Sequence, residues 1–183
     1  MDLILLTLVI IAFVIVAACL VSSLVFLLFG LTIFLGAPYV PTPLKVVKRM
    51  IELAEPKPGE TFYDLGSGDG RIIIGAAINY NLKAVGYEIN PILVYYSREK
   101  IKRLGLQSKA KAYWGNFFRK NLSDADIVLV YLLQPTNNFL EKKFISQLKP
   151  GTRIVSLSFT FKDIPFVKAD TVYPQIRLYQ IPK

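Results

Sequence analysis

Hydrophobic residues follow two different patterns along the chain. Between Leu3 and Leu35 almost every residue is apolar, and Asp2 is the only charged residue before Lys45. About 20 apolar residues suffice to cross a bilayer as a helix, and at about 1.5 Å per residue this run would extend for about 50 Å. The pattern predicts one transmembrane helix within residues 1–36, either tilted or continuing beyond the hydrocarbon core.

From Lys45 onward the apolar segments are short and are separated by Gly, Pro and polar residues. Strands are expected around Phe62–Leu65 and over Leu82–Glu88, Lys109–Trp114, Asp126–Leu133 and Arg153–Phe159. Helical spacing falls between them, over Leu44–Ala54, after the glycines at 66–70, from Asn90 to Leu104, and through Leu140, Phe144 and Leu148. Such alternation predicts an α/β fold with a Rossmann-like, mainly parallel sheet. Val172–Ile181 is expected to close it as an antiparallel hairpin.

A proline-rich junction separates the two patterns. It covers Gly36–Pro43, with the sequence GAPYVPTP, and is followed by the predicted helix Leu44–Ala54, whose Val47, Met50, Ile51 and Ala54 share one face. The chain therefore divides into an anchor (1–36), a junction with one helix (37–60) and a globular domain (61–183).

Charge and flanking residues predict the orientation of the anchor. The chain carries a net charge of +9, spread along the domain, and Lys45, Lys48 and Arg49 follow the apolar run closely while nothing basic precedes it. The positive-inside rule then places the domain in the cytoplasm, as a single-pass membrane protein. A cleaved signal peptide is the rival interpretation, but this run is longer than such peptides and lacks a basic start.

The reactive side chains limit the chemistry. The chain has one cysteine, Cys19, and no histidine. A zinc site built from Cys and His, a histidine general base and a Ser-His-Asp triad are therefore excluded, and no metal is expected.

The strongest motif is the stretch TFYDLGSGDGR at 61–71, in which a β-prone segment meets alternating glycines and then a helical apolar run. Glycines at such a turn let a ligand approach the backbone closely. The third glycine of the dinucleotide fingerprint would fall at Arg71, so that pattern fails. Alternating glycines preceded by Asp64 are instead typical of methyltransferases that use S-adenosylmethionine, whose ammonium suits Asp64 or backbone carbonyls. The predicted cofactor residues in this turn are Asp64, Gly66, Ser67, Gly68, Asp69 and Gly70.

A second acidic residue fits the same cofactor. The segment AVGYEINP ends a predicted strand at Glu88, at the separation from Gly66 expected for one strand–helix–strand unit. A carboxylate there can accept both ribose hydroxyls of the cofactor. Ile89 and Asn90 adjoin it and are also predicted to bind the cofactor, as are Asn116 and Phe117 further along the chain. Asn90-Pro91 is expected to cap the next helix.

Ligands of parallel α/β sheets bind at the carboxyl ends of the strands. The glycine turn, Glu88, Asn116-Phe117 and Tyr131–Pro135 all fall at such ends. Aromatic rings near a sulfonium contribute cation–π attraction, for which Tyr39, Tyr131 and Phe159 are candidates. Gln134 is a candidate for orienting the acceptor, so Tyr131 and Gln134 are the predicted catalytic residues.

The succession of the apolar run, PYVPTP, YDLGSGDGRIIIGAA, AVGYEINP and LKPGTRIVSLSF resembles a known family. It is similar to the membrane-anchored seven-β-strand methyltransferases whose mitochondrial members trimethylate lysines in the c-subunit of ATP synthase and in the adenine nucleotide translocase. The resemblance implies cofactor roles for Asp64, Gly66, Gly68, Gly70 and Glu88. It places Asn116 where many of these enzymes carry an acid near the adenine. Without an Arg-rich transit peptide, a prokaryotic member is expected.

Four functions remain open on the sequence. The leading hypothesis is a protein-lysine N-methyltransferase acting on a membrane-associated protein. The second is methylation of a lipid-phase small molecule, such as a quinone precursor or a lipid headgroup. The third is RNA methylation, which the basic charge favours and the anchor opposes. The fourth is a non-catalytic membrane protein that binds the cofactor.

Overall fold

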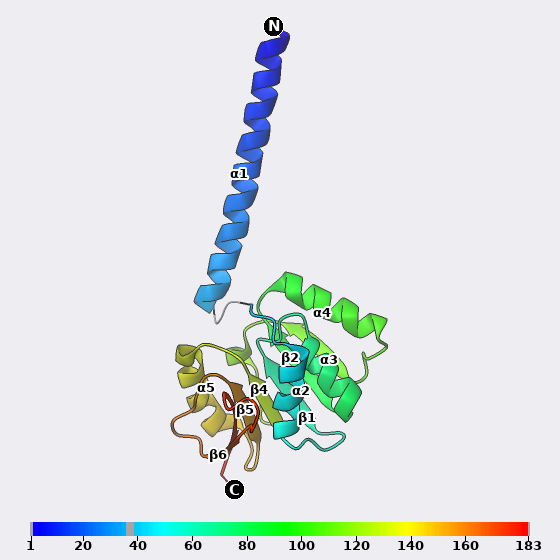
Figure 1. The fold of residues 1–183 in the computed structure, drawn as a ribbon, viewed down its shortest axis with the longest axis vertical. Coiled ribbons are helices and arrows are strands. Elements are labelled where there is room, and N and C mark those ends of the chain that lie inside the picture. Colours follow the sequence, from blue (N-terminus) through cyan, green and yellow to red (C-terminus); the bar gives the residue numbers. More distant parts are fainter. Residues whose placement is uncertain (1, 36–38, 183) are drawn as a thin grey trace. The chain divides into compact units, whose positions relative to one another are not determined.

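The computed structural model describes residues 2–35 and 39–182 (Figure 1). Contacts group the chain into two compact units, Met1–Pro38 and Tyr39–Lys183. The helix that was assigned to the junction by its sequence belongs to the second unit, which we call the domain. Part of the proline-rich junction, residues 36–38, lies outside the described residues.

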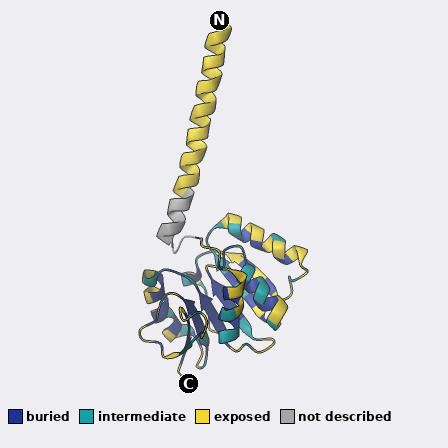
Figure 2. Cartoon of the chain, in the orientation of Figure 1, coloured by how far each residue is buried: buried dark blue, intermediate teal, exposed yellow. Residues whose placement is uncertain are grey.

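The first unit is one helix, α1, over Leu3–Leu35. Its segment Leu3–Leu27 is long and apolar enough to cross a membrane, and each described side chain along it is exposed (Figure 2). The hydroxyl of Thr7 donates to the carbonyl of Leu3 at 2.8 Å, so this polar group is satisfied within the helix. By length and composition the helix is therefore a candidate membrane span.

The domain is built on a seven-stranded sheet in the order β3-β2-β1-β4-β5-β7-β6. The first five strands in that order are parallel, and β7 pairs antiparallel with both β5 and β6. This confirms the predicted sheet, mainly parallel with an antiparallel end. The strands span Thr61–Leu65 (β1), Lys83–Glu88 (β2), Ala110–Trp114 (β3), Ile127–Val130 (β4), Arg153–Leu157 (β5), Phe166–Ala169 (β6) and Ile176–Gln180 (β7).

Two predicted strands end earlier in the structure, and the hairpin lies elsewhere. β4 stops at Val130 instead of Leu133, because α5 begins at Gln134 with a proline in its first turn. β5 stops at Leu157, because Ser158 adopts a left-handed backbone with φ of 69°. Val172–Ile181 was expected to hold both hairpin arms. Instead it holds only the second arm, β7, and the first arm, β6, precedes it. Asp170 Oδ1 accepts from the backbone N–H groups of Val172 and Tyr173, which stabilises the turn between the two strands.

Helices cover both faces of the sheet. The helices are α2 (Leu44–Leu53), α3 (Arg71–Tyr80), α4 (Pro91–Arg103) and α5 (Gln134–Gln147), with a short 3₁₀ helix over Phe117–Arg119. The predicted face of α2 is buried, and it packs with α3 against one face of the sheet in the main apolar cluster. On the opposite face, Asn137 of α5 donates to the hydroxyl of Ser156 in β5 at 3.3 Å.

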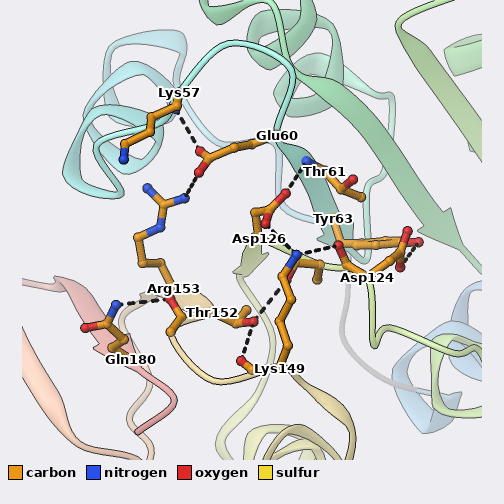
Figure 3. A network of polar contacts seen from close by, with 12 residues as sticks. Lys57, Glu60, Thr61, Tyr63, Asp124, Asp126, Lys149, Thr152, Arg153 and Gln180 are labelled. Atoms are coloured by element: carbon orange, nitrogen blue, oxygen red, sulfur yellow. Dashed lines mark hydrogen bonds and ion pairs between the residues drawn. The ribbon is translucent and has the colours of Figure 1, made fainter. Parts of the chain in front are cut away.

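A polar network joins the amino ends of β1, β4 and β5 (Figure 3). Arg153 Nη1 donates to the carbonyls of Ala54 and Glu55 at 2.7 and 2.8 Å, and its Nη2 pairs with Glu60 at 2.6 Å. Asp126 accepts from the N–H of Thr61 and pairs with Lys149 at 2.6 Å. These bonds attach the end of α2 to the strands and therefore fix the position of α2, the first helix of the domain.

Arg153→Met should lower the free energy of unfolding by about 2–3 kcal/mol, because it leaves two carbonyls and a half-buried carboxylate without their donor. Lys48→Met is the control: Lys48 forms an exposed pair with Glu52 at 3.8 Å, and its loss should cost about 0.5 kcal/mol or less. Guanidinium unfolding of the full chain in mild detergent measures both. Equal midpoints for the two variants would contradict the role given to Arg153.

Candidate cofactor site

The glycine turn connects β1 to α3 at the carboxyl edge of the sheet. Gly66, Gly68 and Gly70 have φ of 88°, 52° and 78°, in the left-handed region that favours glycine. The N–H groups of Gly66 and Ser67 both donate to the carbonyl of Tyr87, at 2.9 and 3.0 Å. These two bonds hold the turn against the end of β2, as the predicted strand–helix–strand unit requires.

Side chains from distant segments press on the turn. A Cβ on Gly68 would lie 2.7 Å from Cε2 of Tyr39, and a Cβ on Gly70 would lie 2.0 Å from Oγ of Ser97 in α4. The glycines are thus required by the chain's own packing as well as by their backbone angles. Tyr39, predicted as an aromatic neighbour of the cofactor, lies directly over the turn.

Asp64 is buried at the end of β1, and its Oδ2 has no hydrogen-bond partner. Burial, together with the nearby charges of Glu88 and Asp69, raises the pKa of the Asp64 carboxyl to about 8. Ser67 Oγ, also buried, is likewise unpartnered. A ligand that brings a cation and hydrogen-bond donors would satisfy these groups, so they fit the methionine end of S-adenosylmethionine.

Glu88 at the end of β2 links the turn to α4. Its Oε2 accepts from the N–H of Gly68 at 2.9 Å, and its Oε1 accepts from the N–H of Asn90 at 2.8 Å. A carboxylate offers about four acceptor positions, so about two remain for the ribose hydroxyls that the sequence assigns to it. The side chain is therefore oriented before any ligand arrives.

A brace of charged residues around the turn was not expected from the sequence. Asp69 pairs with Arg71 at 2.9 Å and with Lys100 of α4 at 2.7 Å. Burial acts to raise the pKa of Asp69, but hydrogen bonds from Arg71 and Lys100 outweigh it and lower the pKa to about 2. Arg71 also donates to the carbonyl of Thr42 at 3.0 Å, which holds the end of the proline-rich junction against the turn. Asp69 is thus a carboxylate held by its own chain.

The other predicted cofactor residues shape the rim of the site. Asn90 caps α4, because its Oδ1 accepts from the N–H of Ile92 at 3.0 Å. The carbonyl of Ile89 accepts from the indole N–H of Trp114 at 2.9 Å. Asn116 caps the 3₁₀ helix through the N–H of Phe118 at 2.9 Å, and Phe117 is buried beside it. Direct contacts of these residues with the cofactor stay predictions.

The two predicted catalytic residues follow β4. Tyr131 is half-buried and packs against the main apolar cluster. The Gln134 amide donates to Asn138 Oδ1 at 2.8 Å and to the carbonyl of Thr160 at 2.9 Å, and it accepts from the N–H of Thr160 at 3.0 Å. Gln134 therefore connects α5 to the segment after β5, where Ser158 is left-handed. The catalytic roles of Tyr131 and Gln134 stay predictions.

Comparison with known proteins identifies the family of the chain. Residues 64–168 match the model of the ANTKMT methyltransferase domain. The chain belongs to this methyltransferase family. It is 46% identical over 126 residues to a protein-lysine N-methyltransferase from Saccharolobus islandicus, covering 68% of this chain and 78% of the relative. It is 36% identical over 124 residues to the mouse lysine N-methyltransferase of the ATP synthase c-subunit, where the match spans 68% of this chain and 49% of the relative.

Similar solved structures indicate which cofactor this protein uses. A Salinibacter ruber protein described as an RNA methyltransferase, in complex with S-adenosyl-L-homocysteine, has a TM-score of 0.69 and 38% identity. The match covers 79% of this chain and 95% of that one. MtNAS in complex with S-adenosylmethionine shares the fold, with a TM-score of 0.62 and 17% identity. The chain is an S-adenosylmethionine-dependent methyltransferase.

Glu88→Ala should weaken S-adenosylmethionine binding at least tenfold, because it removes the ribose acceptor and frees the N–H of Gly68. Gly68→Ala should do the same through the clash with Tyr39 and the strained φ. Calorimetric titration of the full chain in detergent measures both variants. Glu52→Ala, in α2 and outside the predicted cofactor residues, is the control and should bind as the wild type does. Wild-type affinity in either site variant would refute this placement of the cofactor.

Cofactor affinity should rise with pH between 5.5 and 7.5. In this range Asp64 is protonated in the free protein, since its pKa is about 8, while the ligand ammonium favours the carboxylate. Binding must therefore release a proton, and this cost falls as the pH approaches 8. The ligand's own amino group, with a pKa of about 7.7–8.0, stays charged across most of this range. Asp64→Asn should bind more weakly and lose the pH slope; an unchanged slope would exclude Asp64 as its source.

Proposed function

We propose that this methyltransferase transfers a methyl group from S-adenosylmethionine to the side-chain amine of a lysine in a membrane-associated protein. The observation that carries the proposal is the combination, in one chain, of this family's cofactor site with an apolar helix whose described side chains have no packing partner. The relatives named above act on protein lysines according to their names. Membership of the family thus supports lysine as the methyl acceptor, and the apolar helix α1 supports a membrane-associated substrate.

Methyl transfer from a sulfonium to an amine needs few acid–base side chains. The bound cofactor supplies a methyl group on a sulfonium, which is a good leaving group, so alignment of the acceptor provides much of the rate. A lysine must first lose its proton, and desolvation lowers its pKa from about 10.4. The half-buried Tyr131 offers an aromatic surface for this purpose at the end of β4. Gln134 would act as a positioning residue, because its amide fixes Thr160.

The orientation in the membrane follows from the flanking charges. Lys45 and Lys48 lie exposed on the first turns of α2, and Arg49 pairs with Asp170 at 2.5 Å. Because these basic residues follow α1 closely, the positive-inside rule supports a cytoplasmic domain and a single span. A cytoplasmic domain has direct access to the cofactor pool.

RNA methylation is the second candidate function. One observation favours it specifically, the 38% identity to the Salinibacter ruber protein described as an RNA methyltransferase. The net charge of +9 is compatible with a polyanion. An apolar helix such as α1 has no purpose in binding RNA, which is why we rank this function below lysine methylation.

Incubation of the purified full chain with tritiated S-adenosylmethionine and membranes of its source should label a protein band, and acid hydrolysis of that band should release methylated lysine. Glu88→Ala should abolish the label, which excludes a contaminating enzyme. Label confined to the organic extract would replace the proposal with a lipid-phase acceptor. Label in added RNA, at a rate that falls steeply with salt, would replace it with the RNA function. Label in no fraction would leave a cofactor-binding protein.

A further inference from the structure

Helix α4 exposes apolar side chains at the edge of the sheet that holds the cofactor site. Ile92, Tyr95 and Tyr96 are 59%, 62% and 56% exposed. Their spacing places them on one face of the helix, and α4 starts three residues after β2 ends at Glu88. The exposed surface of α4 is visible in Figure 2. Three large side chains of this kind, grouped on one turn beside a ligand site, are more than the scattered exposure that soluble surfaces show.

Trp114 extends this surface from the neighbouring strand. It is the last residue of β3, it is paired in register with Glu88, and it is 63% exposed. Its indole N–H already donates to the carbonyl of Ile89 at 2.9 Å. The exposed ring can therefore enter an apolar medium without stranding a donor. We call Ile92, Tyr95, Tyr96 and Trp114 the aromatic rim.

Cations follow the rim along the same helix. Lys102 and Arg103 in the last turn of α4 are exposed and continue the face of Tyr95, Tyr96 and Glu99. A helix with aromatic residues on its exposed face and Lys or Arg further along has the composition of helices that lie in the lipid–water interface. Trp and Tyr concentrate at that depth in membrane proteins.

The chain enters the domain at the same edge. Tyr39 packs over Gly68, and Val40 and Leu44 beside it are 53% and 69% exposed. The amino edge of the sheet carries the charged network of Figure 3 instead. The exposed apolar side chains named here therefore lie at the carboxyl edge, beside the ion pairs of Asp69.

From these observations we infer that the aromatic rim rests in the lipid–water interface, so that the cofactor edge of the domain faces the bilayer. The occupant of this surface is lipid, with the rings at headgroup depth and Lys102 and Arg103 on anionic headgroups, which attract such cations. The inference rests on the proposed membrane location and narrows the substrate class to lysines that lie at the level of the headgroups. In this arrangement α1 tethers the domain to the membrane, and the aromatic rim docks the domain on the bilayer so that the cofactor site faces its substrate.

Trp114 is the single tryptophan of the chain, so its fluorescence reports on the rim alone. The full chain is incorporated into nanodiscs of phosphatidylcholine and phosphatidylglycerol, with or without lipids brominated near the headgroup end of the acyl chain. We expect emission at shorter wavelength than in a water-exposed protein, at least twofold quenching by the brominated lipids, and protection from iodide. Strong iodide quenching without bromolipid quenching, in protein that co-elutes with the discs, would overturn the inference.

The matched variants exchange two exposed apolar residues at a time. Tyr95→Ser with Tyr96→Ser should reduce bromolipid quenching at least twofold. Ile78→Ser with Ile145→Ser, at similarly exposed positions near the far ends of α3 and α5, should leave it unchanged. Equal effects of the two pairs of substitutions would overturn the inference. Quenching of Trp114 fluorescence by added RNA, without quenching by brominated lipids, would also overturn it. Failure of the chain to co-elute with discs would instead refute the membrane location, whereas the tritium label tests the acceptor independently.

Discussion

The cofactor site depends on a few backbone hydrogen bonds that hold the glycine turn to the end of β2. One carbonyl, that of Tyr87, receives the N–H groups of both Gly66 and Ser67, and Glu88 receives that of Gly68. These bonds fix the turn before a ligand is present, so the binding free energy is not spent on ordering it. Together with the pairing of β1 and β2, they hold Asp64 and Glu88 at one edge of the sheet, where these acids suit the ammonium and the ribose of one cofactor. Residues further away act by keeping this arrangement rigid.

The two edges of the parallel sheet differ in how well their buried polar groups are satisfied. At the amino edge Arg153, Glu60, Asp126 and Lys149 satisfy one another and the backbone (Figure 3). At the carboxyl edge Asp64 and Ser67 are buried with unpartnered oxygen atoms. Groups left unsatisfied in this way reduce stability unless a ligand completes them. The fold can keep them because the network at the other edge and the apolar core hold the strands in place.

Much of this arrangement follows from short-range patterns in the sequence. The glycine spacing, Asp64 and Glu88 predicted the cofactor class correctly, because each is a local signal tied to a strand end. The end of β4 and the hairpin were misplaced for a different reason. Whether Tyr131–Leu133 continue a strand depends on where α5 packs, and the turn at 170–175 depends on an Asp170 side chain that hydrogen-bonds backbone N–H groups. The Asp69–Arg71–Lys100 brace joins residues 31 positions apart, and no periodic pattern reports such a contact.

The chain has no histidine that could act as a general base. We therefore expect the environment of the acceptor lysine to lower its pKa, so that the amine can release its proton to water. Desolvation disfavours the ammonium, and a site at the lipid–water interface already excludes much of the water that stabilises it. The aromatic rim, the chain entering at Tyr39 and the end of β4 with Tyr131 all belong to the edge of the sheet where the cofactor binds. Position and chemistry are therefore coupled in the proposed function: the surface that brings the site to the bilayer also lowers the polarity in which the acceptor amine loses its proton. A soluble domain with the same cofactor residues would have to build that environment from its own side chains.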